Sequence, residues 1–235
     1  MSGRCELIVA LDLRDRSEAL NLVDMLGDAV RFYKVGMELF YREGPSVIAD
    51  VASRGIGVFL DVKVHDIPNT AAAAVRQLVE FGPAMLSLHA AGGHEMLRVA
   101  AETAGSVPQT VRRPLLVAVT LLTSIDADSL RREMFVQASP REYVLSMARL
   151  AKGAGVDGVV CSADEVSAIK EECGRDFVTV VPGVRPSWSE RMDQKRVATP
   201  RQAAKSGADF IVVGRPITRA KDPLDAAMRI LEEIK

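Results

Sequence analysis

The chain has 235 residues, and its 30 Lys and Arg almost balance its 31 Asp and Glu, which gives a formal net charge of −1. Its 48% hydrophobic and 26% charged residues are ordinary for a globular protein with one large core. These values exclude a disordered chain, a collagen, a coiled coil and a protein with a global basic field for nucleic acid or an anionic membrane.

Eight short apolar runs rich in β-branched residues recur along the chain. Such runs are typical of strands buried on both faces of a parallel sheet. We expect strands at residues 7–11, 32–35, 58–63, 85–89, 115–122, 158–162, 179–184 and 210–215. Helical patterns fill the intervals, at residues 17–27, 45–54, 70–81, 95–104, 140–152, 163–173, 200–206 and 223–234, with a small extra helix near 128–134.

Capping signals support several of these helix starts. Ser139 and Thr199 each precede a proline and stand three residues before a Glu or Gln, which is the pattern of a capping box. Ser162 begins a third such pattern, and Asp222 precedes the proline that opens the last helix.

The order of elements is therefore strand then helix, eight times. Dividing 235 residues by eight gives about 29 residues, the size of one βα unit. Eight such units close naturally into a (β/α)₈ barrel, the TIM-barrel fold, and we predict one such α/β domain over residues 1–235. The alternative is a doubly wound open sheet, which usually has a glycine-rich fingerprint after its first strand. Residues 12–15, Asp-Leu-Arg-Asp, contain none.

Charged residues stand at the ends of the first three predicted strands. Asp12 follows the first, Lys34 lies in the second, and Asp61 and Lys63 lie in the third. Because side chains alternate along a strand, Asp61 and Lys63 share one face and the apolar residues between them occupy the other. A carboxylate flanked by ammonium groups keeps each partner charged and offsets the cost of burial, so we predict a site at the barrel mouth. The alternative is a solvated salt pair on an edge strand.

The last two predicted strands end in arginines. Arg185 follows the seventh strand, and Gly214 and Arg215 end the eighth. In barrels of this kind a phosphate commonly binds at the loops after strands 7 and 8. A glycine lets the backbone approach an anion closely, and an arginine offers a bidentate fork. We therefore predict a phosphate site there, over which the polar loop 187–198 closes. For either arginine alone, a purely structural role is the alternative.

Two other kinds of residue have simpler interpretations. His89 and His94 flank a glycine turn, but no convergent set of Cys, His and carboxylates accompanies them. We therefore expect hydrogen-bonded histidines and no metal site. The three cysteines lack CxxC spacing and fit a reducing, cytoplasmic environment without disulfides. Trp188 is either a lid contact or a packing residue.

The third strand also carries a specific motif. Its continuation over residues 61–70, DVKVHDIPNT, matches the D-x-K-x-x-D-I-P-N-T signature of the orotidine 5′-monophosphate decarboxylase family, and the chain resembles bacterial members. Further segments similar to that family lie in order along the chain, at residues 9–12, 34–36, 89–93, 121–124, 182–186, 193–196 and 213–216. The loop at 187–189 departs from the pattern, because relatives often have a more glycine-rich lid.

The resemblance implies a function. The chain would decarboxylate orotidine 5′-monophosphate to UMP, the last step of de novo UMP synthesis, without metal or cofactor. In the implied catalytic array of Lys34, Asp61, Lys63 and Asp66, Lys63 protonates C6 of the pyrimidine. The resemblance also implies a cytoplasmic homodimer with shared sites.

The resemblance assigns the substrate contacts as well. Asp66, Ile67 and Thr70 would reach into the partner subunit's site. Asp12 would bind the ribose hydroxyls and Thr123 would lie near the pyrimidine. The residues implied to hold the 5′-phosphate are Arg185, Gln194, Gly214 and Arg215.

Two other functions stay open on sequence alone. A relative such as 3-keto-gulonate 6-phosphate decarboxylase also uses a D-x-K strand, but it needs Mg²⁺ and is not expected to continue with residues 66–70 as they stand here. A barrel that only binds a phosphate or nucleotide is the third possibility, although such a protein gains nothing from placing Asp61 beside a substrate carboxylate.

Overall fold

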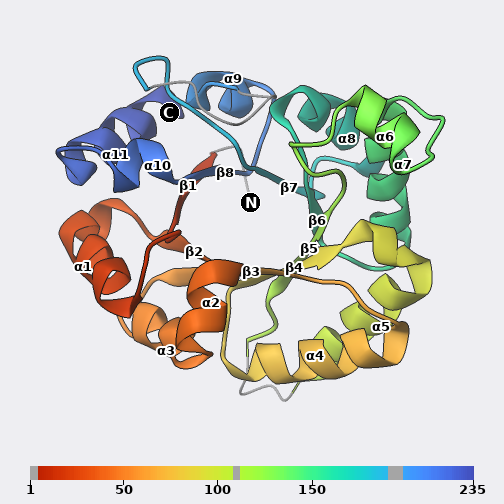
Figure 1. Cartoon of the computed structure of the whole chain (residues 1–235), viewed down its shortest axis with the longest axis horizontal. Coiled ribbons are helices and arrows are strands. Elements are labelled where there is room, and N and C mark those ends of the chain that lie inside the picture. The colour runs from red at the N-terminus through yellow and green to blue at the C-terminus, as the bar shows by residue number, and fades with distance from the viewer. Residues whose placement is uncertain (1–4, 108–111, 190–197) are drawn as a thin grey trace.

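The computed structural model describes residues 5–107, 112–189 and 198–235. Within these residues eight parallel strands close into one barrel, in which each strand pairs with its sequence neighbours and β8 pairs with β1 (Figure 1). The strands are β1 Glu6–Ala10, β2 Phe32–Gly36, β3 Gly57–Val64, β4 Met85–His89, β5 Leu115–Val119, β6 Gly158–Val160, β7 Val178–Val181 and β8 Phe210–Val213. The predicted (β/α)₈ barrel is confirmed.

Helices surround the ring of strands (Figure 1). The α-helices are α1 Arg16–Leu26, α2 Met37–Glu43, α3 Ser46–Ala52, α4 Pro68–Glu80, α5 Gly93–Gly105, α6 Ala127–Arg132, α7 Pro140–Gly153, α8 Val166–Cys173, α9 Pro200–Lys205, α10 Arg215–Thr218 and α11 Pro223–Glu233. Short 3₁₀ helices occur at η1 Gly27–Ala29, η2 Ala90–Gly92 and η3 Ala163–Glu165. No helix in the described part of the chain is long and apolar enough to cross a membrane.

Alternation along the strands produces two apolar layers. The outer and larger layer lies between the strands and the helices, and the inner layer fills the barrel. The buried members of the inner layer are Ile8, Ala10, Phe59, Met85, Val117, Val180 and Val212. Because the inner layer fills the barrel, the residues at the carboxyl ends of the strands lie directly on top of it.

The capping boxes predicted at Ser139 and Thr199 are present. Ser139 and Thr199 each accept a hydrogen bond from the backbone N–H three residues on, and the Glu142 and Gln202 side chains bond back to the cap. The Asp222 side chain accepts from the Asp225 N–H at the start of α11. Each such cap contributes on the order of 1 kcal/mol, which fixes where these helices begin.

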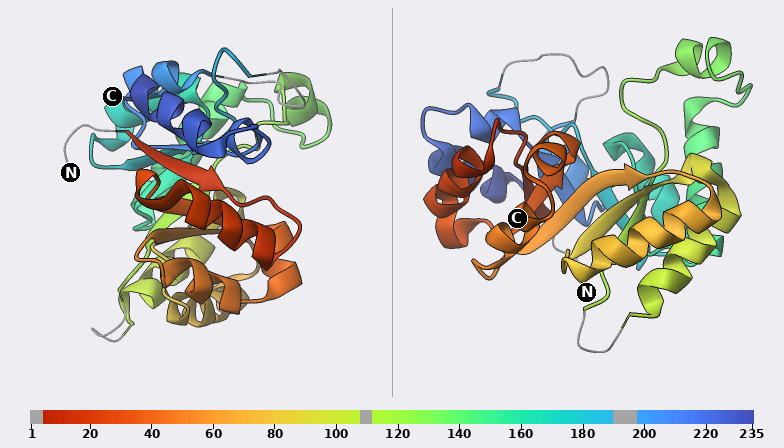
Figure 2. Two further views of the ribbon diagram at one scale, coloured as in Figure 1. Left: turned by 90° about the vertical axis from the view of Figure 1, so that its left-hand side faces the viewer. Right: turned by 60° about the horizontal axis from the view of Figure 1, so that its bottom comes forward.

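The structure differs from the prediction mainly just beyond the strands. β5, β6, β7 and β8 end earlier than predicted, and the residues that follow each of them line the mouth of the barrel. Two short helices, α2 and α10, are additional; both follow a glycine cap without a side-chain hydrogen bond, so the sequence gives no start signal. The small helix after β5 is present as α6, in a segment that stands away from the ring of helices (Figure 2).

Candidate active site

The inward-facing side chains of the first strands change from apolar to charged toward the carboxyl ends. β1 places Ala10 in the inner core, and Asp12 follows two residues later; β3 places Phe59 there, followed by Asp61. Lys34 of β2 is in register with Ala10 and Phe59, and its ammonium group reaches Asp12 and Asp61. Because a step of two residues keeps the same face, these charges form a layer directly above the inner core, at the end of the barrel where catalytic groups occur.

These residues form one chain of alternating charge. Lys34 Nζ lies 2.9 Å from Asp12 Oδ1 and 3.8 Å from Asp61 Oδ2, and Lys63 Nζ lies 3.0 Å from Asp61 Oδ1. The side chains of Lys34 and Asp61 are only 12% and 13% exposed, against 26% for Lys63. The closed barrel has no edge at β3, so the alternative of a solvated edge-strand pair is wrong.

The end of β3 is irregular at Lys63. β3 advances by four residues, from Leu60 to Val64, where its partner β4 advances by two, and Lys63 has a φ of 52°. A non-glycine residue in this left-handed region costs on the order of 1–2 kcal/mol. Val62 and Val64 nevertheless pack against the outer core, and Asp61 and Lys63 line the same cavity. The predicted division of faces is therefore confirmed, although the backbone that achieves it is a bulge.

Gly36 makes room for the charged pair beside it. A Cβ atom at this position would lie 2.8 Å from Lys34 Nζ and 3.0 Å from Asp12 Oδ1. Any side chain at position 36 would therefore displace the ammonium group from its carboxylate.

The two predicted arginines lie in one cavity of about 600 Å³ at the mouth of the barrel. Arg185 is buried, and its backbone N–H donates to Ala198 O at 2.9 Å, which joins the two described ends of the loop. Arg215 opens α10 and so lies beyond β8, a correction to the predicted strand that ran to this residue. Asp12, Gly214, Arg14 and Arg219 also line this cavity, which therefore combines four arginines with a close approach of backbone.

A second, smaller cavity of about 160 Å³ adjoins the first. Among the described residues, Lys34, Pro182 and Val212 line both, so the two cavities form one cleft. The other residues lining the smaller cavity are Phe59, Asp61, Lys63, Val119, Leu121, Leu122, Thr123, Val160 and Cys161. The cleft thus has a charged end for an anion and a mainly apolar end, and Asp61 and Lys63 stand at the apolar end.

Three predicted site residues lie away from this cleft in their own chain. Asp66, Ile67 and Thr70 are exposed at the start of α4, and the Ile67 side chain is 67% exposed. Asp66 Oδ1 accepts from the Ile67 N–H at 2.7 Å, and none of the three lines either cavity. Gln194 lies outside the described residues. Trp188 stacks on Arg229 of α11, 4.2 Å from the ring centroid, which supports the packing interpretation of this tryptophan.

Two histidines stack beside the site. The rings of His65 and His89 are 5.0 Å apart and inclined by 16°, and His89 Nδ1 accepts from the Ala91 N–H at 3.2 Å. Burial, then the nearby His65 and Lys63, lower the pKa of His89. The prediction of a hydrogen-bonded histidine at a turn is confirmed. Within the described ranges, no three His, Cys, Asp or Glu side chains are placed to hold a metal ion.

The sequence reasoning missed Ser87, which touches both Asp61 and Lys63. Its hydroxyl accepts from the Lys63 N–H at 2.8 Å and donates to Asp61 Oδ1 at 2.9 Å. A serine within an apolar strand gives no signal of a site. The only available clue was its position, two residues after an inward-facing methionine.

Comparison with known proteins agrees with this geometry. The chain is 47% identical to the orotidine 5′-phosphate decarboxylase of Moorella thermoacetica, over 100% of this chain and 94% of the relative, and 46% identical to that of Carboxydothermus hydrogenoformans, over 97% and 95%. The crystal structure of orotidine 5′-phosphate decarboxylase from Lactobacillus acidophilus matches with a TM-score of 0.87 and 42% identity, over 98% of this chain and 99% of the other. A sequence model of the orotidine 5′-phosphate decarboxylase / HUMPS family matches residues 6–230, and the chain belongs to this family.

Proposed function

We propose that Lys63 supplies the proton in the reaction of this chain, the decarboxylation of orotidine 5′-monophosphate to UMP in pyrimidine biosynthesis. The reaction follows from full-length relatives at 45–47% identity, all named orotidine 5′-phosphate decarboxylase. One observation carries the assignment to Lys63: its ammonium group is paired with Asp61 at the apolar end of the cleft, 3.0 Å away.

The shape of the cleft supports one orientation of the substrate. The 5′-phosphate binds at the charged end, where Arg185, Gly214 and Arg215 stand. Gln194, which lies outside the described residues, is proposed as a further contact from the resemblance alone. Hydrogen bonds to a charged group contribute roughly 1.5–3 kcal/mol each, so this end supplies much of the binding energy. The ribose then lies near Asp12 and Lys34, where the two cavities meet.

The pyrimidine occupies the smaller cavity beside Thr123, which brings its C6 carboxylate toward Asp61. The substrate carboxylate and Asp61 are both negative, and their repulsion at this short distance disfavours the bound ground state. When the bond from C6 to the carboxylate breaks, CO₂ leaves and the electron pair stays on C6. Lys63 stabilises this charge and transfers a proton from Nζ to C6, and water then returns a proton to the amine.

The decisive experiment adds orotidine 5′-monophosphate to protein stripped with EDTA and follows UMP and CO₂. We expect full turnover without added metal. Loss of turnover that Mg²⁺ restores would favour the Mg²⁺-dependent sugar-phosphate decarboxylases of the same superfamily, although residues 66–70 argue against them. Binding of the nucleotide without any turnover would favour a barrel that only binds.

The proposal includes a homodimer with shared sites. Asp66, Ile67 and Thr70 are exposed at the start of α4 and do not line their own chain's cleft, which supports a role in the site of a second copy. Mixing Asp61→Ala chains with Asp66→Ala chains should regenerate some intact sites and restore part of the activity. No recovery, after subunit exchange has been demonstrated, would contradict shared sites.

A cytoplasmic location is also part of the proposal. It is supported by Cys5, Cys161 and Cys173, which are buried as thiols.

A further inference from the structure

Ser87 is a fully buried polar residue beneath the charged array. It lies in β4 between Leu86 and Leu88, both of which belong to the outer core, so its side chain points into the barrel. Met85, two residues earlier, belongs to the inner core. Ser87 has no exposed surface and lines neither cavity, so it does not touch a ligand in the cleft.

One hydroxyl group makes two different hydrogen bonds at this position. It accepts from the Lys63 backbone N–H at 2.8 Å and donates to Asp61 Oδ1 at 2.9 Å. The direction of each bond follows from chemistry, because the amide has only a proton to give and an ionised carboxylate only accepts. Asp61 Oδ1 also accepts from Lys63 Nζ at 3.0 Å, so Ser87 and Lys63 hold the same carboxylate oxygen.

The bulge in β3 explains why a side chain is needed here. In a regular ladder the N–H of a strand residue bonds a backbone carbonyl of the neighbouring strand, but the register shift between Leu60 and Val64 removes that arrangement. An unpaired N–H at this depth would be costly, and Lys63 already has a φ of 52°. The Ser87 hydroxyl replaces the missing carbonyl and so helps to hold Lys63 in its left-handed conformation.

We propose that Ser87 is a positioning residue for the decarboxylation, a proposal that rests on the function proposed above. Its hydroxyl fixes the backbone from which the Lys63 ammonium group projects, and it fixes the Asp61 carboxylate that this ammonium group pairs with. Displacement of a reacting group by about 1 Å can cost on the order of 100-fold in rate. Ser87 therefore acts through Asp61 and Lys63 and makes no contact with the substrate.

The test compares wild type, Ser87→Ala and Ser87→Thr in kcat, KM and the Kd of UMP. We expect Ser87→Ala to lower kcat about 10- to 100-fold. Its Kd for UMP should stay within about twofold, because the phosphate and ribose contacts come from other strands. Ser87→Thr keeps the hydroxyl and should restore most of kcat. A Ser87→Ala kcat within about twofold of wild type, or a Ser87→Thr variant as slow as Ser87→Ala, would overturn the proposal.

A second variant covers the case in which Ser87→Ala does not fold. Ser87→Cys keeps the side-chain volume, but its thiol is a weak donor and acceptor. It should fold and show the same loss of kcat, and a wild-type kcat in Ser87→Cys would overturn the proposal. Should wild type itself form no UMP, it is the proposed function that fails.

Thr179 offers a matched control at the opposite end of the barrel. It is equally buried, and its hydroxyl also donates to a carboxylate, Asp209 Oδ2, at 2.9 Å. Thr179→Val removes that bond without approaching the cleft, so it should lower the melting temperature and leave kcat unchanged. If Thr179→Val lowers kcat as much as Ser87→Ala does, the effect of Ser87 is general loss of stability, and the positioning role is wrong.

Discussion

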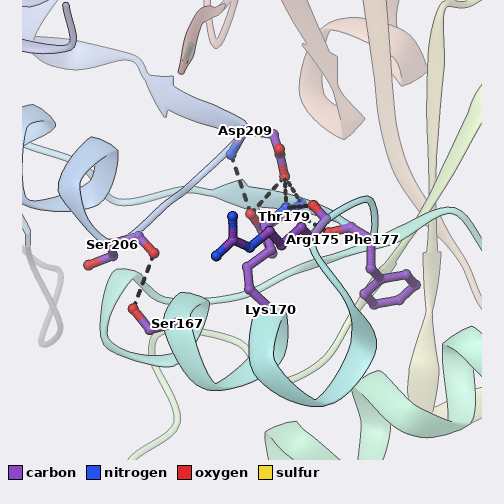
Figure 3. Close-up of polar contacts among 7 residues, drawn as sticks. All are labelled: Ser167, Lys170, Arg175, Phe177, Thr179, Ser206 and Asp209. Atoms are coloured by element: carbon purple, nitrogen blue, oxygen red, sulfur yellow. Dashed lines mark hydrogen bonds and ion pairs between the residues drawn. The ribbon is translucent and has the colours of Figure 1, made fainter. Parts of the chain in front are cut away.

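The barrel holds a lysine–aspartate cluster at each end, and the two differ in how fully their hydrogen bonds are used. At the carboxyl ends of the strands, Lys63 pairs with Asp61. At the opposite end, just before β8, Lys170 of α8 pairs with Asp209, 2.6 Å between Nζ and Oδ2 (Figure 3). The residue types are the same, so the difference lies in their surroundings.

In the Lys170–Asp209 pair, called the lower cluster here, every ammonium proton is used within the protein. Lys170 Nζ donates to Arg175 O and Phe177 O, both at 2.9 Å, as well as to Asp209, so all three ammonium protons have protein acceptors (Figure 3). Asp209 Oδ2 also accepts from the backbone N–H and the hydroxyl of Thr179. These bonds fasten α8 and the starts of β7 and β8 to one another, and they leave Lys170 no proton for a ligand.

In the Asp61–Lys63 pair, called the upper cluster here, the Lys63 ammonium group can still donate to a ligand. Among the described residues, the hydrogen-bond partner of Lys63 Nζ is Asp61 alone, and the side chain opens to the cleft. Its backbone is in the left-handed region, while none of the lower-cluster residues is. The comparison teaches that a lysine–aspartate pair is structural when protein groups use all its protons, and available for chemistry when they do not.

Lys63→Ala should sharpen this comparison most. We expect kcat to fall by about 10³-fold or more, because general acid catalysis contributes roughly 10²–10⁴-fold and the charge of Lys63 is lost as well. The free energy of unfolding should change little, since Asp61 keeps Lys34 and Ser87 as partners. Lys63→Arg keeps a positive charge but releases no proton, so it should be equally slow. Fast turnover in either variant would contradict the role of Lys63 as proton donor.

Arg215→Ala should have the next largest effect. Losing a hydrogen bond to a charged group costs roughly 1.5–3 kcal/mol, so we expect kcat/KM for orotidine 5′-monophosphate to fall about 10- to 100-fold. With orotidine, which lacks the phosphate, variant and wild type should be alike. Arg201→Ala, at an exposed position of α9 that does not line the cleft, is the control. An equal loss with both substrates would show that Arg215 does not act through the phosphate.

Asp209→Ala should reverse the pattern of Lys63→Ala. It leaves the Lys170 ammonium group, only 13% exposed, without its carboxylate, and it removes the acceptor of two Thr179 donors. We expect the free energy of unfolding in urea to fall by about 2 kcal/mol, a value reduced because Asp209 itself is 37% exposed. kcat should be unchanged at temperatures where the variant is folded. A large loss of kcat in the folded variant would contradict the claim that this end of the barrel is structural and only the other end is catalytic.

Much of the fold could be predicted from the sequence because the strands are buried on both faces and therefore appear as apolar runs. α2 and α10 could not, since they directly follow Gly36 and Gly214, which have no side chain to cap a helix and mark its start. The upper array was predictable from Lys34, Asp61 and Lys63, because charged residues inside apolar strands are unusual. The lower cluster was not, because Lys170 comes from a helix pattern and Asp209 precedes its strand, where a charged residue is ordinary.

The finer geometry of the site could not be predicted. Lys63 has no intrinsic preference for a left-handed conformation, so nothing in the sequence indicates the bulge. Ser87 is one hydroxyl in an apolar strand, and its role appears only when β3 and β4 are placed side by side. Both features depend on the pairing of two strands, which a local pattern does not contain.

His89→Asn should give the smallest effect, a change in how the free energy of unfolding depends on pH. The lowered pKa of His89 means that the unfolded chain, with an ordinary pKa near 6.5, binds a proton more readily than the folded chain. The stability that neutral His89 contributes is therefore complete above about pH 7 and is lost as the pH falls through the lowered pKa. Asn at the same position can still cap Ala91 but does not titrate.

The free energy of unfolding of wild type should thus fall between pH 7.5 and pH 5.5, and the fall should be smaller in His89→Asn. His94→Asn, at an exposed histidine, should keep the wild-type slope. Identical slopes in all three proteins would mean that the proton affinity of His89 is the same folded and unfolded, so that burial and its neighbours His65 and Lys63 do not act on it. A shallower slope in His89→Asn alone would instead show that burial, with His65 and Lys63 close by, disfavours a positive charge on His89.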